Sequence, residues 1–512
     1  MWGWRSSRTV VTLTAAVVFV VVCMLPLLFM LWAAFAEPGN AVSALQGLLL
    51  DRRQAGLLYN TVLLGCGTAV LATLVGAPLG FGLARFALPF KSGLRLALVA
   101  PAVLPPYVIA LALIYLGGNL AATLGGAIVA LTIVLYPLAM LATEVAVRQI
   151  EPRLEEAAIL VATPGRVLKR ITWPLVAPGV VSTALVIFVL AISEFSVPGL
   201  LRVRVFTTEV FTAFAALYDF GRATMLALPL LIVSVVLASI AASHMRSRVV
   251  ATRRNVRGEP LAVFDDWRPA VLTLISCAIV AMLVVPVTAL VREALRSVSI
   301  VGVVRNSREA VINSLFLAFW GATVVTMLAA CLGYARARAP VRVSGALDAL
   351  WLVLFTVPST VIGIGLIGMW NRANAFSAYG TSAMLVLGYL ARFVPIGALA
   401  LAATVRSVPE SQEEAAALAG AGWLRTMRRI VLPQIRIGLL AVWVISFMLA
   451  FGEVGTSILV APPGESTLPI RVYTLTANAP PGQVAALALF QSVVILFPLA
   501  LLGVTMATRE TS

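Results

Sequence analysis

The stretch Glu413–Pro433, with the sequence EEAAALAGAGWLRTMRRIVLP, decides how the rest of the chain is organised. A second copy, EEAAILVATPGRVLKRITWP, occupies Glu155–Pro174. Both copies begin with Glu-Glu-Ala-Ala, continue through a basic amphipathic segment and end at proline. Each copy is a polar island between long apolar runs. The two islands therefore mark two related halves of a membrane protein.

The composition places the chain in a lipid bilayer. Hydrophobic residues make up 61% of the 512 residues and charged residues only 11%, whereas a soluble protein carries about 25% charged residues. The net charge is +16, but the basic residues lie in short loops and form no basic helix face with aromatic residues. We therefore expect lipid, and no nucleic acid, as a partner. The cysteines lie in apolar runs and the single histidine stands alone, so no metal site is expected.

Apolar runs of about 20 residues, the length that spans a bilayer core, predict 12 transmembrane helices, six in each half. The first run, Val10–Ala36, ends in a sequence like a signal-peptidase site, but it is longer than a secretory signal and predicts an uncleaved helix. The predicted fold is an all-α integral membrane bundle. Its predicted spans are residues 10–36, 58–84, 94–116, 122–143, 178–200, 225–243, 270–291, 311–335, 346–370, 381–404, 437–459 and 485–507.

Landmark residues recur in the second half at offsets of 253 to 259 residues. The matched pairs include Gly80 with Gly333, Arg85 with Arg338, Pro105 with Pro358, and Glu194 with Glu453. The repeat unit contains five spans and one island, and each half adds a span before it. Because the number of spans per half is even, the halves are predicted to be parallel, with a pseudo-two-fold axis along the membrane normal.

Lysine and arginine residues set the predicted orientation. With the N-terminus in the cytoplasm, the inner segments hold 25 of the 37 basic residues and the outer loops hold 11. This bias predicts that both termini and both islands are cytoplasmic. The predicted domains are a first helix with its outer loop at 1–57, a first repeat unit at 58–243, a basic cytoplasmic linker at 244–268, an extra helix with its outer loop at 269–310, and a second repeat unit at 311–507.

Each island is predicted to form a helix, a sharp turn and a short amphipathic helix on the membrane surface. Glu155–Val161 and Glu413–Ala419 are good helix formers with glutamate in the first turn. Gly420, or Pro164-Gly165 in the first copy, ends that helix, and Leu424–Val431 presents an apolar face. A solvated basic loop or an interfacial helix held by lipid headgroups would also fit one copy. Two copies at matching positions favour docking of a partner.

The second copy resembles the loop of the type I ABC importer permeases: Glu-Ala-Ala, three residues, Gly, nine residues, Ile, one residue, Leu-Pro. It matches that pattern at Glu414, Ala415, Ala416, Gly420, Ile430, Leu432 and Pro433. The first copy departs from it, because Val161 or Ala162 stands where glycine is expected, the loop is one residue shorter, and Trp173 replaces leucine. The resemblance covers most of the chain and implies a MetI-like five-helix core in each half.

The resemblance also implies how the islands are used. Each loop would insert a coupling helix into a cleft on a dimer of cytoplasmic ATP-binding subunits, which bind ATP and Mg, in the bacterial inner membrane. A periplasmic binding protein would deliver the solute. The docking residues that it implies are Glu155, Glu156, Ala157, Ala158, Pro164, Gly165, Glu413, Glu414, Ala415, Ala416, Gly420 and Pro433.

Two permease units in one chain are similar to the fused permeases for ferric iron, and also to those for thiamine. The segments Leu459–Gly464 and Arg471–Tyr473, with Thr207–Phe211 in the first half, look more like the iron group. Ferric iron is therefore the expected cargo, with thiamine or another small solute such as a polyamine, phosphonate or sulfate as the alternative. A separate binding protein selects the cargo, so the permease sequence alone does not name it.

The chain is not expected to be an enzyme. It contains no Gly-x-x-x-x-Gly-Lys-Ser/Thr, and its only lysines, Lys91 and Lys169, cannot complete a phosphate-binding loop. No cofactor is expected in this chain, and ATP hydrolysis is assigned to a separate subunit. A secondary transporter with parallel six-helix halves would explain the spans, but it would not explain the paired islands and would be expected to carry more charge within the membrane.

Ionisable residues in the spans are costly in hydrocarbon and usually face a cavity or a partner. Glu194 and Glu453 occupy equivalent positions, and Arg392 lies within a span of the second half. One interpretation places all three on the translocation path, where carboxylates would attract a hard cation. The other places each glutamate near the membrane surface, bonded to a neighbouring helix.

Overall fold

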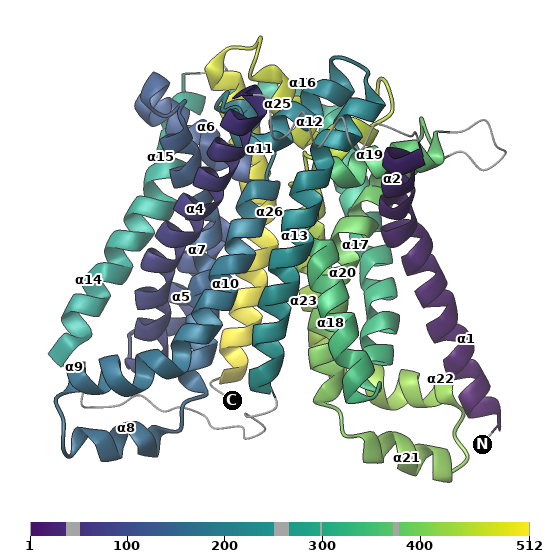
Figure 1. The fold of residues 1–512 in the computed structure, drawn as a ribbon. Helices are drawn as coiled ribbons and strands as arrows, with labels where there is room; N and C mark the ends of the chain where they lie inside the picture. Colours follow the sequence, from purple (N-terminus) through teal and green to yellow (C-terminus); the bar gives the residue numbers. More distant parts are fainter. Residues whose placement is uncertain (1, 37–51, 250–265, 297–298, 372–377, 511–512) are drawn as a thin grey trace. The chain divides into compact units, whose positions relative to one another are not determined.

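The computed structural model describes residues 2–36, 52–249, 266–296, 299–371 and 378–510. Its described elements are all helical (Figure 1). Ten helices are long and apolar enough to cross a membrane, and two bent pairs bring the number to as many as 12. The predicted all-α membrane fold is therefore confirmed. Most of the predicted linker at 244–268 lies outside the described residues.

The helices follow the same order in the two halves of the chain. In the first half they are α1 (Trp2–Phe19), η1 (Val20–Met24), α2 (Leu25–Ala36), α4 (Arg52–Arg85), α5 (Lys91–Val103), α6 (Pro106–Gly117), η2 (Gly118–Leu120), α7 (Leu124–Arg148), α8 (Pro152–Ile159), α9 (Pro164–Val167), η3 (Leu168–Thr172), α10 (Trp173–Ser193), α11 (Ser196–Leu200), α12 (Phe206–Ala215) and α13 (Phe220–Val249).

In the second half they are α14 (Arg268–Ile279), η5 (Val280–Val284), α15 (Val285–Ala294), α16 (Ile300–Asn306), α17 (Arg308–Ala337), α18 (Val341–Thr356), α19 (Ser359–Trp370), α20 (Ala383–Arg406), α21 (Glu410–Leu418), α22 (Trp423–Thr426), η6 (Met427–Val431), α23 (Leu432–Phe451), α24 (Ser457–Val460), α25 (Leu468–Leu475) and α26 (Pro481–Glu510).

Four π-helical segments extend the repeat to the first span of each half. η3 and η6 begin 259 residues apart, and η1 and η5 begin 260 residues apart. In each case a proline is the second residue after the segment: Pro26, Pro174, Pro286 and Pro433. Proline cannot donate to the carbonyl four residues before it, and its ring clashes with that carbonyl. A wider π turn in front of the proline relieves this conflict, so the helix continues.

Two predicted spans, 94–116 and 346–370, are bent rather than continuous. α5 and α6 meet at 92°, and α18 and α19 meet at 94°. The bends lie where Leu104 precedes Pro105 and Val357 precedes Pro358, and all four residues have extended backbone conformations. A residue before proline is driven out of the helical region. The matched prolines in the sequence carried this information, but the hydropathy pattern did not.

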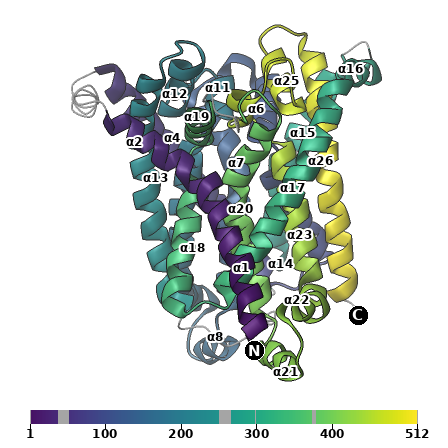
Figure 2. The ribbon, with the colours of Figure 1, turned by 90° about the vertical axis from the view of Figure 1, so that its right-hand side faces the viewer.

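The described chain forms two compact units that do not follow the sequence halves. The second-repeat unit combines residues 1–45, 210–231 and 307–471, and the first-repeat unit combines residues 46–209, 232–306 and 472–512. In the second-repeat unit, α1 packs against α17 and α22, and α2 packs against α19 (Figure 2). In the first-repeat unit, α15 packs against α6 and α26. Each unit therefore contains helices from both halves of the sequence.

Close helix contacts in each unit depend on small residues. A Cβ atom added at Gly80 would lie 2.2 Å from the Met140 carbonyl oxygen of α7, and one added at Gly333 would lie 2.9 Å from the Ala402 nitrogen of α20. Small residues let membrane helices approach this closely, and close packing drives their association in lipid. The repeated glycines thus fix the contacts of α4 with α7 and of α17 with α20.

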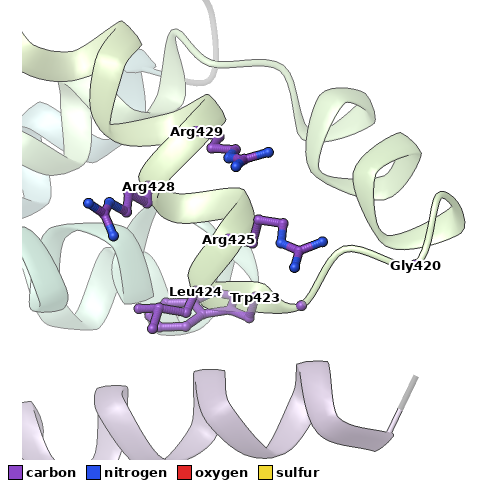
Figure 3. A pocket seen from close by; sticks show the side chains of 7 residues that line it. Gly420, Trp423, Leu424, Arg425, Arg428 and Arg429 are labelled. Atoms are coloured by element: carbon purple, nitrogen blue, oxygen red, sulfur yellow. The ribbon is translucent and has the colours of Figure 1, made fainter.

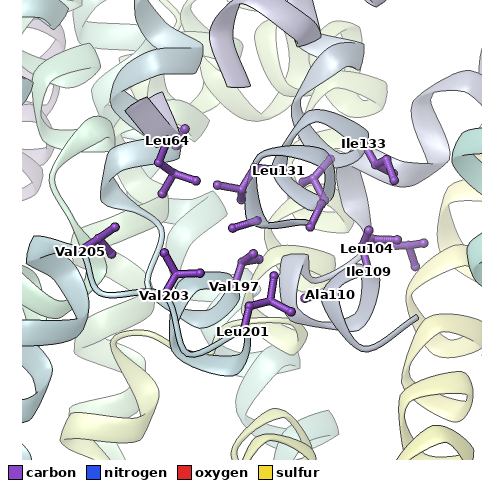
Figure 4. Packing of buried hydrophobic residues seen from close by; sticks show 14 residues of the cluster. Leu64, Leu104, Ile109, Ala110, Leu131, Ile133, Val197, Leu201, Val203 and Val205 are labelled. Carbon is purple, nitrogen blue, oxygen red and sulfur yellow. The ribbon is translucent and has the colours of Figure 1, made fainter. Parts of the chain in front are cut away.

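Buried apolar side chains pack around these contacts. In the first-repeat unit, a buried cluster joins Leu64 of α4, Ile109 of α6, Leu131 of α7 and Val197 of α11 (Figure 4). Leu64 is fully buried and Leu131 is 1% exposed. This cluster holds α6 and α11, the short helices after the two backbone breaks, against the long helices.

Candidate functional site

The second island forms α21, a turn at Gly420, and α22. Gly420 has φ +78°, the left-handed conformation that glycine adopts without strain. Its amide donates to the Ala417 carbonyl, and the Ala421 amide donates to the Ala416 carbonyl, so the turn satisfies the last carbonyls of α21. No heavy atom lies within 4 Å of an added Cβ at Gly420. This position therefore requires glycine because of its left-handed backbone conformation, and not because a side chain would clash with a neighbour.

The first island reaches the same arrangement without a left-handed residue. α8 ends at Ile159, and Thr163 caps a new helix in which Pro164 is the first residue. Proline suits this position because its missing amide hydrogen would have no helical partner there. Pro164 and Gly165 therefore open α9 instead of ending α8, which explains why this copy needs no glycine in the turn.

The predicted separate amphipathic helices are instead the first turns of membrane spans. Trp423–Phe451 and Pro164–Ser193 are each continuous span candidates. Sequence reasoning ended each short helix at the prolines Pro433 and Pro174, but the π segments η6 and η3 carry the helix past them. The second helix of each loop is consequently rigidly joined to its span.

The two glutamates of each Glu-Glu pair have different environments. Glu155 is fully buried and Glu413 is 4% exposed, whereas Glu156 and Glu414 are exposed. The first glutamate of each pair therefore holds its loop to the protein, and the second faces outward. The repeat alone could not distinguish them.

Glu413 binds the end of α17. The Arg338 guanidinium donates to Glu413 Oε1 from Nε at 2.9 Å and from Nη2 at 2.5 Å. The Tyr334 hydroxyl donates to Glu413 Oε2 at 2.7 Å and accepts from the Trp423 indole at 3.3 Å. This network connects α21, α22 and α17.

Glu155 makes the equivalent contact with α4. It lies 2.6 Å from Arg85, and neither side chain is exposed. The Thr172 hydroxyl donates to its other oxygen at 2.6 Å, and Arg85 also donates to the Val147 carbonyl. Arg85 and Arg338 were recognised in the sequence only as landmarks of the repeat. Their recurrence near the end of matched spans was the available signal for this role.

The outward side of the second loop is basic and partly apolar. A cavity of 790 Å³ is lined by Gly420, Gly422, Trp423, Leu424, Arg425, Arg428 and Arg429 (Figure 3). Leu418 is 89% exposed and Leu424 is 70% exposed. In the first loop, Leu160 and Val161 are each 86% exposed. Exposed apolar side chains beside exposed charges are typical of a surface that a partner covers.

A second set of ion pairs fixes the helices beside the loops. In the first-repeat unit, Glu144 of α7 is 1% exposed and pairs with Arg95 of α5 and with Arg148. In the second-repeat unit, Arg336 of α17 pairs with Asp348 of α18. Asp348 stands 253 residues after Arg95, so the sign of the charge at this repeat position is reversed.

Glu194 and Glu453 both stand at a backbone break after a long helix. Glu194 ends α10, and its carboxylate accepts from the Ser196 amide at 2.8 Å, where α11 begins. Glu453 follows α23 and accepts from the Thr456 amide at 2.7 Å, just before α24. Both carboxylates therefore satisfy amides at the start of a short helix.

The structure brings Arg392 to Glu453. Arg392 Nε of α20 lies 3.3 Å from Glu453 Oε2. The residue at the matching position of the first repeat, 258 residues earlier, is Val134. This cation is therefore specific to the second repeat. Glu194 and Glu453 belong to different compact units.

Comparisons with known proteins agree with this architecture. Residues 322–508 match the family described as binding-protein-dependent transport system inner membrane component. The chain is similar to the Fe(3+)-transport system permease protein FbpB 2 of Haemophilus influenzae, with 24% identity over 88% of this chain and 89% of that protein. It is also similar to the probable ABC transporter permease protein y4fN of Sinorhizobium fredii, with 22% identity over 94% and 92%.

A shorter relative is the molybdenum transport system permease protein ModB of Mycobacterium tuberculosis, 31% identical over 32% of this chain and 62% of that protein. The full-length matches span both repeats, as expected for two permease units in one chain. With the apolar spans and the paired loops, these matches show a multi-pass inner-membrane protein that resembles the binding-protein-dependent ABC transport permeases, and among them the ferric iron group.

Proposed function

We propose that this chain is the permease subunit of an ATP-driven importer that moves ferric iron delivered by a periplasmic binding protein. The observation that carries the proposal is the pair of loops, each held by a buried glutamate and each exposing apolar side chains. The similarity to an Fe(3+)-transport permease over 88% of the chain supports the cargo. Both termini and both loops are assigned to the cytoplasm, as the basic residues predict.

Each loop transmits force because its second helix continues into a span. A subunit that binds α22 moves α22 and α23 together, because Trp423–Phe451 is one continuous helical span. The buried Glu413–Arg338 pair carries the same movement to α17. In this mechanism a separate subunit dimer binds ATP and Mg and hydrolyses ATP, and this chain supplies the moving spans.

Substitutions on the exposed side of the loop test the docking role. Leu424→Asp places a charge on a side chain that is 70% exposed, so the fold should be unchanged while binding of the ATP-binding subunit falls. Leu120→Asp is the matched control, because Leu120 is 85% exposed outside both loops. Co-purification with the ATP-binding subunit is the measurement. Equal co-purification of both variants would contradict docking at this loop.

The carboxylates at the helix breaks are proposed to border the translocation path. Arg392 lies against Glu453 and offsets its charge, so the two repeats offer a moving cation unequal surroundings. Hard oxygen ligands suit a ferric ion. Uptake of iron-55 by cells with the permease, its ATP-binding subunit and its binding protein should fall in a Glu194→Gln, Glu453→Gln double variant of normal abundance. Full uptake would remove the carboxylates from the path.

A second candidate cargo is a small solute such as thiamine, a polyamine, phosphonate or sulfate. The similarity to a molybdenum permease at 31% identity and the second-repeat cation Arg392 favour an oxyanion among these. The same cells should then accumulate labelled sulfate or molybdate and no iron-55. Uptake of iron-55 with no uptake of the oxyanions supports the ferric assignment.

A further inference from the structure

The two docking loops share a buried Arg–Glu pair but differ in what surrounds it. In the second loop, Tyr334 links Glu413 to Trp423 through its hydroxyl group. The matching residues of the first loop are Phe81 and Pro164, which offer neither a hydroxyl nor an indole. The hydroxyl that binds Glu155 comes instead from Thr172, within the loop's own helix. The hydroxyl–indole link is therefore specific to the second loop.

The first helix of the chain completes this second network. The Arg8 guanidinium carbon lies 5.6 Å from the centre of the Tyr334 ring. Val11 packs against the cluster that contains Tyr334, Trp423 and Met427. α1 contacts both α17 and α22, and Figure 3 shows it running beside Trp423 and Leu424. Arg8 and Val11 thus meet the loop from a helix about 400 residues away in sequence.

The equivalent helix of the first-repeat unit, α14, has different neighbours. α14 packs against α4 and α5, with Val271 beside Gly82. Arg268 matches Arg8 at an offset of 260 residues and is exposed. The aromatic ring at the matching position is Phe81, which carries no hydroxyl. The chain therefore contains a matched arginine that is a natural control.

We propose that α1 braces the second docking loop, with Arg8 and Tyr334 acting as positioning residues that hold Glu413 and Trp423 in place. The proposal rests on the proposed docking function. The cation over the ring and the two hydrogen bonds of the hydroxyl favour a single position of Tyr334. The second loop consequently depends on α1, a helix outside its own repeat. In the first loop, Thr172 of the loop itself donates to the buried glutamate Glu155.

Hydrogen exchange of the purified full-length permease tests the brace without any ligand or partner. Tyr334→Phe keeps the ring and removes only the hydroxyl, and Arg8→Gln removes the cation. Arg8→Gln should speed amide exchange in residues 413–431 by roughly two- to thirtyfold, the range for loss of a partly buried cation–π contact. Tyr334→Phe should speed it by roughly tenfold or more, the range for loss of a hydrogen bond to a charged group. Arg8→Lys keeps a cation and should restore slow exchange. Arg268→Gln should leave the second loop unchanged.

A cycle of variants separates positioning from general damage. In a Tyr334→Leu background, Arg8→Gln should have no further effect, because the ring it contacts is gone. Unchanged exchange in Arg8→Gln and Tyr334→Phe would overturn the brace, as would equal effects of Arg8→Gln and Arg268→Gln. Faster exchange together with co-purification that Leu424→Asp does not reduce would keep the brace and refute the docking function.

Discussion

Replacing Glu413 by glutamine tests whether a single buried charge holds the second loop. The change preserves side-chain shape and removes the charge from a pair in which both side chains are 6% exposed. Arg338 keeps its 2.9 Å bond to the Val408 carbonyl and a 3.7 Å contact with Glu410, which is 64% exposed. Breaking a buried ion pair costs about 3–5 kcal/mol. These remaining contacts place the expected loss at the lower end, about 3 kcal/mol.

The loss should be local, because the network joins α21 to α17 and α22, and the hydrogen bond from the Gln434 amide to Gln412 of α21 remains. About 3 kcal/mol corresponds to a rise of roughly 150-fold in the population of the open loop, measured by hydrogen exchange of residues 408–431. Glu414→Gln changes the neighbouring exposed glutamate and should alter stability by less than about 0.5 kcal/mol.

Replacing both Arg338 and Glu413 by apolar residues tests the same ion pair in a second way. Arg338→Met combined with Glu413→Leu removes both charges, and well-packed apolar replacements of a buried ion pair are often neutral in stability. Exchange in the double variant should be slower than in Glu413→Gln, but still faster than in the wild type, because the Tyr334 hydroxyl loses its acceptor. If Glu413→Gln behaves like Glu414→Gln, the buried pair does not hold the loop and the reasoning is wrong.

Three further predictions concern the backbone and the helix contacts. Gly420→Ala should destabilise the second loop by about 1–2 kcal/mol because alanine is strained at φ +78°. Gly422→Ala is the control and should cause no such loss, because Gly422 has φ −68°. Thermal unfolding of the purified permease compares the two variants. Pro433→Ala restores a backbone donor, so the π turn before it should become α-helical, with slower amide exchange at residues 427–433. Gly80→Val should prevent assembly of a stable permease, since its Cβ would lie 2.2 Å from a carbonyl of α7. Gly56→Val is the control, because a Cβ at Gly56 has no atom within 4 Å, and the yield of detergent-stable protein distinguishes the two variants.

The sequence predicted the features that depend on composition and local pattern. Each predicted span overlaps an apolar helix or bent pair, because a bilayer demands a long apolar run whatever the tertiary packing. The bends at Pro105 and Pro358 were missed because hydropathy does not report backbone conformation. The same prolines were visible as a matched pair, so repeat and proline rules together could have placed them.

The site was predictable only in part, because its decisive contacts are distant in sequence. Glu413 and Arg338 are separated by 75 residues, and no local pattern says which glutamate of the pair turns inward. The packing of α1 with α17 and α22 could not be predicted either, because apolar helices of similar composition carry no local pattern that identifies their packing partners. The positions of Glu194 and Glu453 in the repeat were evident, but their role as acceptors at a helix break required the backbone.

The composition of the two compact units has a consequence for biosynthesis. α1 and α2 belong with α17 to α24, which begin only at residue 308. At about 5–20 residues per second, translation leaves α1 in the bilayer for roughly 15 to 60 s before its packing partners exist. During that time its packing surface faces lipid or the insertion machinery. The order of synthesis therefore makes completion of the second-repeat unit a late, long-range event, and residues 244–268 must be translated before either unit can close.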